Sequence, residues 1–107
     1  MTATLIDDPI LVQVRSALNQ LYGDRIERVV LFGSRARGDA REDSDYDIAV
    51  FPRDVTDMAA ERKRLGTLSA AILFGEFKTV HAMPMRAGAW RERTPIMHEI
   101  REDGIDL

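Results

Sequence analysis

Two aspartates separated by one residue, Asp45 and Asp47, lie downstream of a Gly33-Ser34 pair, and ten residues separate Ser34 from Asp45. Carboxylates are hard oxygen ligands, and Mg²⁺ usually takes one or two of them together with water and substrate phosphates. A glycine turn lets a phosphate approach the main chain, where the Ser34 amide and hydroxyl can contact it. The pattern favours metal-assisted chemistry at a phosphate, with one metal or with two that are about 3.5 to 4 Å apart.

The elements that must position these residues are two short apolar runs, at 29–32 and 48–51. Both read as buried strands, one ending at Gly33 and the other leaving from Asp47. Side chains alternate along a strand, so Asp45 and Asp47 are expected on one face with their Cα atoms about 6.5 to 7 Å apart. Like charges so placed repel when no metal is bound. A turn cap at Ser44-Asp45 is the alternative for an isolated Asp-x-Asp, and the two flanking strands argue against it.

Arginines occupy the segment between the two motifs. Guanidinium groups can pair with phosphate through two parallel hydrogen bonds. Arg35 follows Ser34 directly and is the stronger candidate for a nucleotide contact, and Arg37 is a weaker one.

The remaining sequence predicts alternating helices and strands. Asp8-Pro9 reads as a helix cap and first-turn proline, and Thr94-Pro95 repeats that pattern near the C-terminus. Thr56 or Asp57 is expected to cap a long helix ending near Leu73. Trp90 is interpreted as a core residue. The first helix has an apolar stripe of Ile10, Leu11, Val14, Leu18 and Leu21 and ends at Gly23, and strands are expected at about 28–32, 45–51 and 78–83.

This order predicts an α/β (α+β) fold in which a small mixed sheet is flanked by helices. The 107 residues are expected to form a single compact domain, 1–107. The net charge of -3 argues against general nucleic-acid binding. There is no cysteine, no apolar run long enough to span a membrane and no signal-like start, so we expect a cytoplasmic protein.

Residues 30–38 (VLFGSRARG) and 44–50 (SDYDIAV) resemble the signature of the DNA polymerase β-like nucleotidyltransferase superfamily. The chain is similar in particular to the minimal nucleotidyltransferases (MNT proteins) that act as antitoxins beside HEPN toxins. The resemblance implies a nucleotidyltransferase-like domain in which Asp45 and Asp47 hold Mg²⁺, or Mn²⁺, and the triphosphate of ATP. It further implies that Gly33, Ser34, Arg35 and Arg37 bind the nucleotide.

The chain departs from the family pattern at His81. In the superfamily, a third acidic residue on the following strand binds the catalytic metal, and aligning residues 80–84 (VHAMP) with that strand places His81 at its position. Imidazole is a poor ligand for Mg²⁺, an acceptable one for Mn²⁺ or Zn²⁺, and a common general base. A histidine-modified enzyme, a slow enzyme and a binding protein without turnover all fit this substitution.

By resemblance, the leading hypothesis is an antitoxin enzyme that transfers AMP from ATP to a hydroxyl, expected to be a tyrosine, of a HEPN-type ribonuclease toxin. An alternative is an MNT-fold antitoxin that lacks turnover and acts by occluding its partner. A less favoured alternative is a subunit of a small-molecule adenylyltransferase. The sequence leaves self-association and a hetero-complex equally open.

Overall fold

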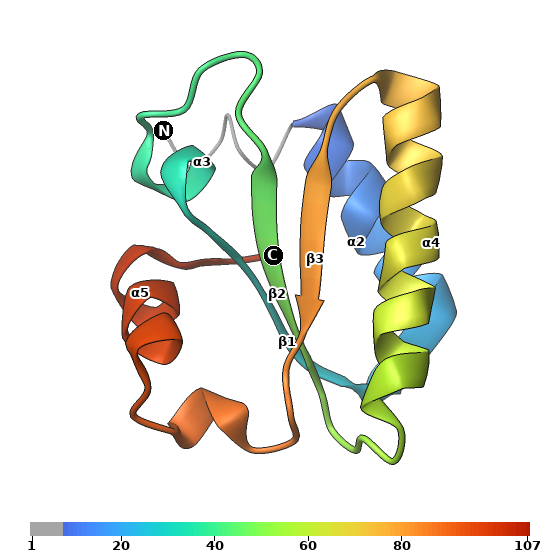
Figure 1. Cartoon of the computed structure of the whole chain (residues 1–107), viewed down its shortest axis with the longest axis vertical. Helices are drawn as coiled ribbons and strands as arrows, with labels where there is room; N and C mark the ends of the chain where they lie inside the picture. Colours follow the sequence, from blue (N-terminus) through green and yellow to red (C-terminus); the bar gives the residue numbers. More distant parts are fainter. Residues whose placement is uncertain (1–7) are drawn as a thin grey trace.

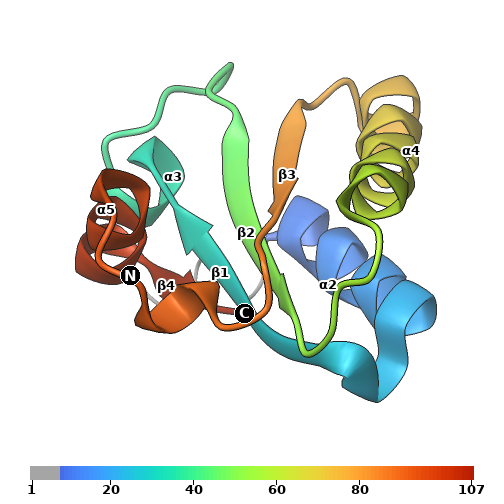
Figure 2. The same cartoon turned by 60° about the horizontal axis from the view of Figure 1, so that its bottom comes forward.

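The computed structural model describes residues 8–107, which form a four-stranded sheet with helices on both faces (Figures 1 and 2). Two 3-10 turns, η1 (Gly23–Arg25) and η2 (Ala89–Arg91), link larger elements. In chain order, the helices and strands are α2 (Pro9–Tyr22), β1 (Ile26–Phe32), α3 (Ser34–Arg37), β2 (Tyr46–Pro52), α4 (Met58–Glu76), β3 (Val80–Pro84), α5 (Pro95–Asp103) and β4 (Ile105–Asp106). None of the described helices is long and apolar enough to cross a membrane.

The strand order is β3-β2-β1-β4, and the sheet is mixed, as predicted. β1 pairs antiparallel with both β2 and β4, whereas β2 and β3 run parallel because α4 crosses over between them. In this register Phe32 lies opposite Asp47, and Asp47 lies beside His81. The end of β1 and the starts of β2 and β3 therefore meet at one edge of the sheet.

The predicted caps are confirmed. The Asp8 side chain accepts a hydrogen bond from the Ile10 amide at 2.8 Å, and Pro9 opens α2. Of the two candidates for capping α4, Asp57 caps the helix by accepting from the Ala60 amide at 3.2 Å. These caps satisfy amides that the first turn of a helix leaves without partners, so they fix where each helix begins.

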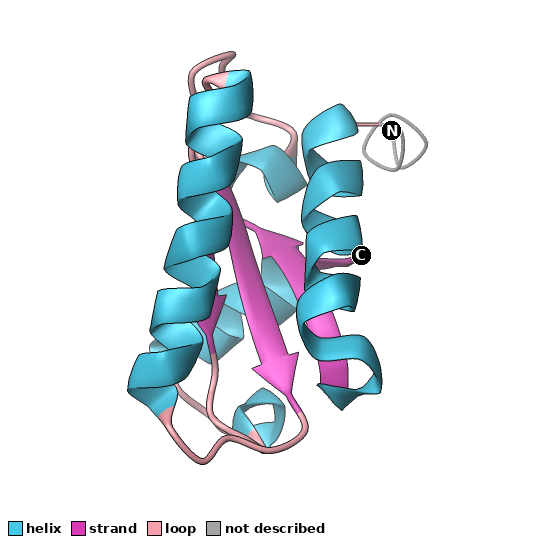
Figure 3. Cartoon of the chain, turned by 90° about the vertical axis from the view of Figure 1, so that its right-hand side faces the viewer, coloured by secondary structure: helices cyan, strands magenta, loops and turns pink. Residues whose placement is uncertain are grey.

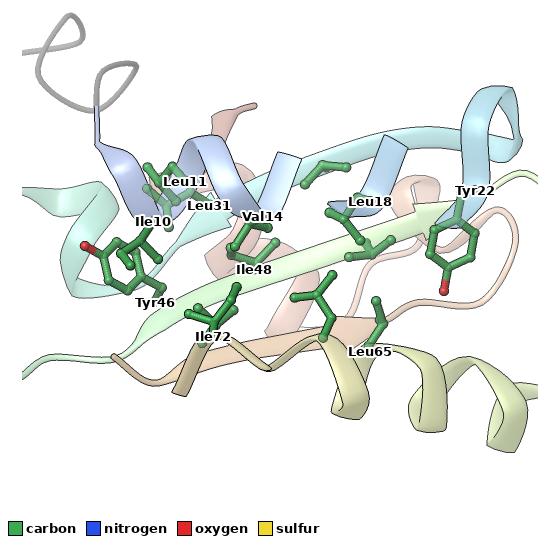
Figure 4. Packing of buried hydrophobic residues seen from close by; sticks show 14 residues of the cluster. Ile10, Leu11, Val14, Leu18, Tyr22, Leu31, Tyr46, Ile48, Leu65 and Ile72 are labelled. Carbon is green, nitrogen blue, oxygen red and sulfur yellow. The ribbon is translucent and has the colours of Figure 1, made fainter. Parts of the chain in front are cut away.

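The larger core cluster lies between the sheet and the pair α2 and α4 (Figure 4). Four of the five residues predicted for the α2 stripe are buried, and the prediction for Leu21 was wrong because its side chain is 43% exposed. Tyr22 is buried one position later instead, where its ring joins the core and its hydroxyl reaches Glu61.

A smaller cluster covers the opposite face beneath α5 and η2. The rings of Phe51 and Trp90 pack edge to face with centroids 5.4 Å apart. The Arg28 guanidinium lies 4.0 Å above the Trp90 ring. Trp90 is half-buried and packs against the cluster, so the interpretation of Trp90 as a core residue is only partly confirmed. The short strand β4 was not predicted, and β1 begins at Ile26, two residues earlier than expected.

Candidate active site

Strand alternation places Asp47 on the α5 side of the sheet. Tyr46 and Ile48 pack in the α2 and α4 core, so Asp47, between them, faces the other way together with Ala49. The Asp47 side chain is 32% exposed and sits where β2 begins. Asp45 lies just before the strand and is exposed. One carboxylate is thus partly enclosed by the fold, and the other is open to solvent.

Gly33 makes room for the Asp47 carboxylate. Its φ angle is 77°, a left-handed conformation that favours glycine, and a Cβ built at this position would overlap Asp47 Oδ2. The turn then closes into α3, with the amides of Ala36 and Arg37 donating to the Gly33 carbonyl at 3.1 and 3.0 Å. The expected glycine turn therefore exists, and it lies directly against the carboxylate that the sequence pattern paired with it. Ser34, half-buried, is the first residue of α3.

Arg35 holds the loop that carries Asp45. Its guanidinium donates to the Ser44 carbonyl at 2.9 Å and to the Glu42 carbonyl at 3.0 Å. The same group lies 4.2 Å above the centroid of the Tyr46 ring. A planar guanidinium suits this combination of stacking and forked hydrogen bonding. Arg35 therefore has a structural role that the sequence did not reveal, and its predicted contact with the nucleotide stays a prediction.

Arg37 forms ion pairs with two carboxylates. It contacts Asp103 at the end of α5 at 3.2 Å and Asp39 at 3.3 Å. Hydrogen bonds to both carboxylates raise the pKa of Arg37 above its ordinary value, and the bond to Asp103 has the largest effect. The exposed pair ties α3 to α5, and its role with nucleotide likewise stays a prediction.

His81 lies beside Asp47 in the sheet. In the parallel register of β2 and β3, it is the neighbour of Asp47, and its Nδ1 atom lies 3.7 Å from Asp47 Oδ1. Its side chain is 64% exposed, so the imidazole is accessible from solvent. The residue that the resemblance aligned with the family's third acidic position thus lies beside the partly buried aspartate, and its equivalence to that position stays a prediction.

The Asp47 carboxyl group has a raised pKa. Burial is the largest cause, and the negative charges of Asp45 and Glu99 raise it further, while His81 and Arg37 act in the opposite direction. Glu99, on α5, was not singled out from the sequence. Its spacing from Asp103 could place both on one side of a helix, but only the packing of α5 near β1 brings that side toward Asp47.

The donor set suits magnesium that is held jointly by protein and nucleotide. Among residues 8–107, no group of three or more His, Cys, Asp and Glu side chains is arranged to hold a metal ion. Asp45 and Asp47 supply the one or two carboxylates that Mg²⁺ usually takes, and the missing Cβ at Gly33 lets the Asp47 carboxylate lie directly against the turn. These residues fit a metal whose remaining ligands are water and substrate phosphates.

A family model described as "Polymerase beta, Nucleotidyltransferase" matches residues 14–82, a segment that contains the glycine turn, both aspartates and His81. The chain belongs to this family. The expected nucleotidyltransferase-like fold agrees with the observed mixed sheet and its covering helices.

Two relatives from Methanocaldococcus jannaschii bear similar names. "Putative protein adenylyltransferase MJ0141" is 32% identical over 54 residues, which are 50% of this chain and 54% of the relative. "Putative protein adenylyltransferase MJ0604" is 51% identical over 35 residues, which are 33% of this chain and 35% of the relative. The matched segment thus spans about half of the first relative and about a third of the second.

Solved structures with the same fold come from toxin–antitoxin systems. A chain from a toxin–antitoxin structure with AMP-PNP has a TM-score of 0.63 at 20% identity, and the match covers 88% of this chain and 68% of that one. A chain from a complex of a tri-AMPylated HEPN toxin with an MNT antitoxin, from Shewanella oneidensis, has a TM-score of 0.53 at 19% identity and coverage of 96% and 69%. At these identities the likeness shows the fold alone.

Proposed function

We propose that this chain is a nucleotidyltransferase that transfers AMP from ATP to a hydroxyl group of a partner protein, a HEPN-type toxin, and thereby neutralises it. The observation that carries the proposal is the position of Asp47 against Gly33, next to Asp45, at the edge where three strand ends meet. The turn would receive the nucleotide's phosphates, and the carboxylates would receive their metal. Family membership supports the same chemistry.

In the proposed reaction, the acceptor hydroxyl oxygen bonds to the α-phosphorus of ATP, and the bond from that phosphorus to pyrophosphate breaks. The hydroxyl proton leaves to a base, for which the accessible His81 imidazole is a candidate, or to water. Asp45 and Asp47 would hold Mg²⁺, which would neutralise charge on the phosphates. Gly33 and Ser34 orient the triphosphate, so that the chain contributes mainly position and electrostatics.

The protein acceptor is supported by the relatives. Two of them are named as protein adenylyltransferases, and one neighbour in fold is a complex that contains an AMPylated HEPN toxin. We infer a tyrosine as the acceptor from the resemblance to the MNT antitoxins. Asp45 is exposed at the edge of the sheet, which leaves the carboxylate pair open to a docked protein.

One observation favours a second function, inhibition of the partner by occlusion without transfer. His81 rather than a carboxylate lies 3.7 Å from Asp47, and this departs from the family pattern where the family binds its catalytic metal. An antitoxin that had lost turnover could keep the fold and the partner surface.

The test is the intact mass of a HEPN-type toxin co-produced with this chain, compared with the same toxin co-produced with the Asp45→Asn, Asp47→Asn double variant. We expect mass increments equal to AMP that disappear with the variant, while the variant still binds the toxin. A toxin that is bound and inhibited but never modified would refute transfer and favour occlusion. Analysis of the products formed with small-molecule acceptors tests the less favoured alternative, a subunit of a small-molecule adenylyltransferase.

A further inference from the structure

A groove runs between α2 and α4 on the face of the sheet opposite Asp47. Figure 3 looks onto this face and shows the two helices side by side in front of the strands. The groove has a volume of about 660 Å³. Its walls are mostly apolar: Ala17 and Leu21 come from α2, and Leu68 and Ile72 come from α4. Leu21 is 43% exposed there, so part of an apolar side chain is presented to solvent.

Hydrogen bonds join the two helices at each end of the groove. At one end, the Gln13 side-chain amide donates to Glu76 at 2.9 Å. At the other end, the Tyr22 hydroxyl donates to the buried Glu61 carboxylate at 2.9 Å. These contacts join the start of α2 to the end of α4 and the end of α2 to the start of α4. The helices are therefore antiparallel and bridged, and the apolar stretch between the bridges is preformed.

The charged residues that line the groove are cations, whereas the carboxylates Glu76 and Glu61 lie at its two ends. The residues that line it include two cations and no carboxylate, and both cations, Lys63 and Arg64, lie on the α4 wall. Arg64 donates to Glu61 at 3.0 Å and is partly neutralised. Lys63 is exposed and forms no ion pair within residues 8–107. A complementary occupant therefore carries apolar side chains for the floor and a carboxylate for the α4 wall.

We propose that this groove binds an acidic amphipathic helix of the acceptor protein. The inference rests on the proposed function for the identity of the partner, and charge complementarity and groove shape determine the kind of segment. An apolar stripe at every third or fourth residue fits a groove between two helices, and flanking acidic residues would meet Lys63. Because the groove and Asp47 lie on opposite faces of the sheet, a helix bound there holds the acceptor without covering the carboxylates.

The test measures the affinity of purified chain for the co-purified HEPN-type toxin by titration calorimetry. Leu21→Glu places an acid in the apolar wall, and Lys63→Glu reverses the free cation. Each has a matched control outside the groove: Val12→Glu, also an exposed apolar residue of α2, and Arg62→Glu, the adjacent exposed cation of α4. We expect the two groove variants to weaken binding by about tenfold or more and the controls by less than about twofold.

A second measurement detects the toxin at the groove by the protection of a thiol and does not require a weakened complex. The chain has no cysteine, so a single thiol introduced at Thr67, which lines the groove, can be labelled selectively. Bound toxin is expected to slow the labelling of the thiol at position 67, whereas a thiol introduced at Arg62 is expected to stay reactive.

The results separate the two proposals. Equal affinities for all four charge variants together with an unprotected Thr67→Cys thiol would overturn the groove assignment, even where AMP transfer to the toxin is observed. Groove-dependent binding without AMP transfer would uphold the groove and refute the proposed enzyme. Failure of the unaltered chain to bind or modify the toxin would refute both.

Discussion

At the scale of single residues, the partly buried Asp47 carboxylate is unfavourable for the fold. Burial, together with the charges of Asp45 and Glu99, raises the pKa of Asp47 above its ordinary value of 3.8. The folded state therefore prefers the protonated form, and no penalty exists below the unfolded pKa, where both states are protonated. The penalty grows as the pH rises through the folded pKa and is complete above it.

This predicts that Asp47→Asn stabilises the chain at pH 7 by about 1 kcal/mol or less, because the amide keeps the shape and removes the charge. Thermal unfolding at several pH values checks it, and the gain should shrink as the pH falls toward 4. Asp43→Asn, in the exposed loop, is the control and should change stability by less than about 0.5 kcal/mol. A loss of stability in Asp47→Asn at pH 7 would contradict the prediction.

The position of His81 leads to a second prediction for single residues. Its Nδ1 atom lies 3.7 Å from Asp47 Oδ1, so a carboxylate at position 81 would lie beside the same metal site. We predict that His81→Asp raises the rate of AMP transfer with Mg²⁺, by about tenfold, which corresponds to about 1.4 kcal/mol of barrier. Rates with Mg²⁺ and Mn²⁺ are compared, because imidazole tolerates Mn²⁺ better. Equal or lower turnover in the variant would show that His81 does not stand in for a carboxylate.

At the scale of elements, the loop from Gly38 to Asp45 is held mainly by Arg35, with a further hydrogen bond from Lys78 Nζ to the Glu42 carbonyl at 3.2 Å. Arg35 bonds to the carbonyls of Glu42 and Ser44 and stacks on Tyr46, and through them it fixes the approach to β2. Lysine keeps the charge but loses the planar fork. We predict that Arg35→Lys lowers stability by about 1 to 2 kcal/mol and speeds amide hydrogen exchange in residues 41–45. Arg41→Lys, in the same loop, should leave exchange unchanged.

The same variant separates loop support from nucleotide binding. If Arg35 acts only by supporting the loop, the affinity of Arg35→Lys for ATP should change little. The rate of AMP transfer should still fall, because Asp45 is no longer held in place. A loss of ATP affinity without faster exchange in the loop would instead support the direct phosphate contact predicted from sequence.

Elements with a local signal could be predicted from the sequence. Asp8-Pro9 and Thr94-Pro95 mark helix starts through their own side chains, and both mark them correctly. The Gly33 turn could also be predicted, because the apolar run at 29–32 ends there, whereas His81 was placed near the aspartates only through the resemblance to the family's following strand. Strand β4 has only two residues, and its pairing with β1 depends on the return of the chain after α5. Glu99 could not be predicted for the same reason, because it comes near Asp47 only through the packing of α5.

At the scale of the whole molecule, the sheet separates the carboxylates from the groove. One face and its edge carry the carboxylates, and the other face carries α2 and α4 with the groove between them. α2 is fastened to the rest of the molecule at both ends by hydrogen bonds from buried tyrosines. The Tyr46 hydroxyl donates to Asp8 at 2.8 Å, and the Tyr22 hydroxyl donates to Glu61 at 2.9 Å.

These two tyrosines, the only ones in the chain, predict how the fold fails in alkali. Burial, followed by the hydrogen bond to a carboxylate, raises the pKa of Tyr22 to about 12 and that of Tyr46 to about 12, from an ordinary value of 10.0. Between these values the unfolded chain loses phenolic protons that the folded chain keeps, so stability falls as the pH rises. Each tyrosine contributes a slope of up to about 1.4 kcal/mol per pH unit. Tyrosinate absorbance should therefore appear together with unfolding, and Tyr22→Phe should remove about half of the slope. Tyrosinate formation in a chain that remains folded would contradict this account of how α2 is fastened.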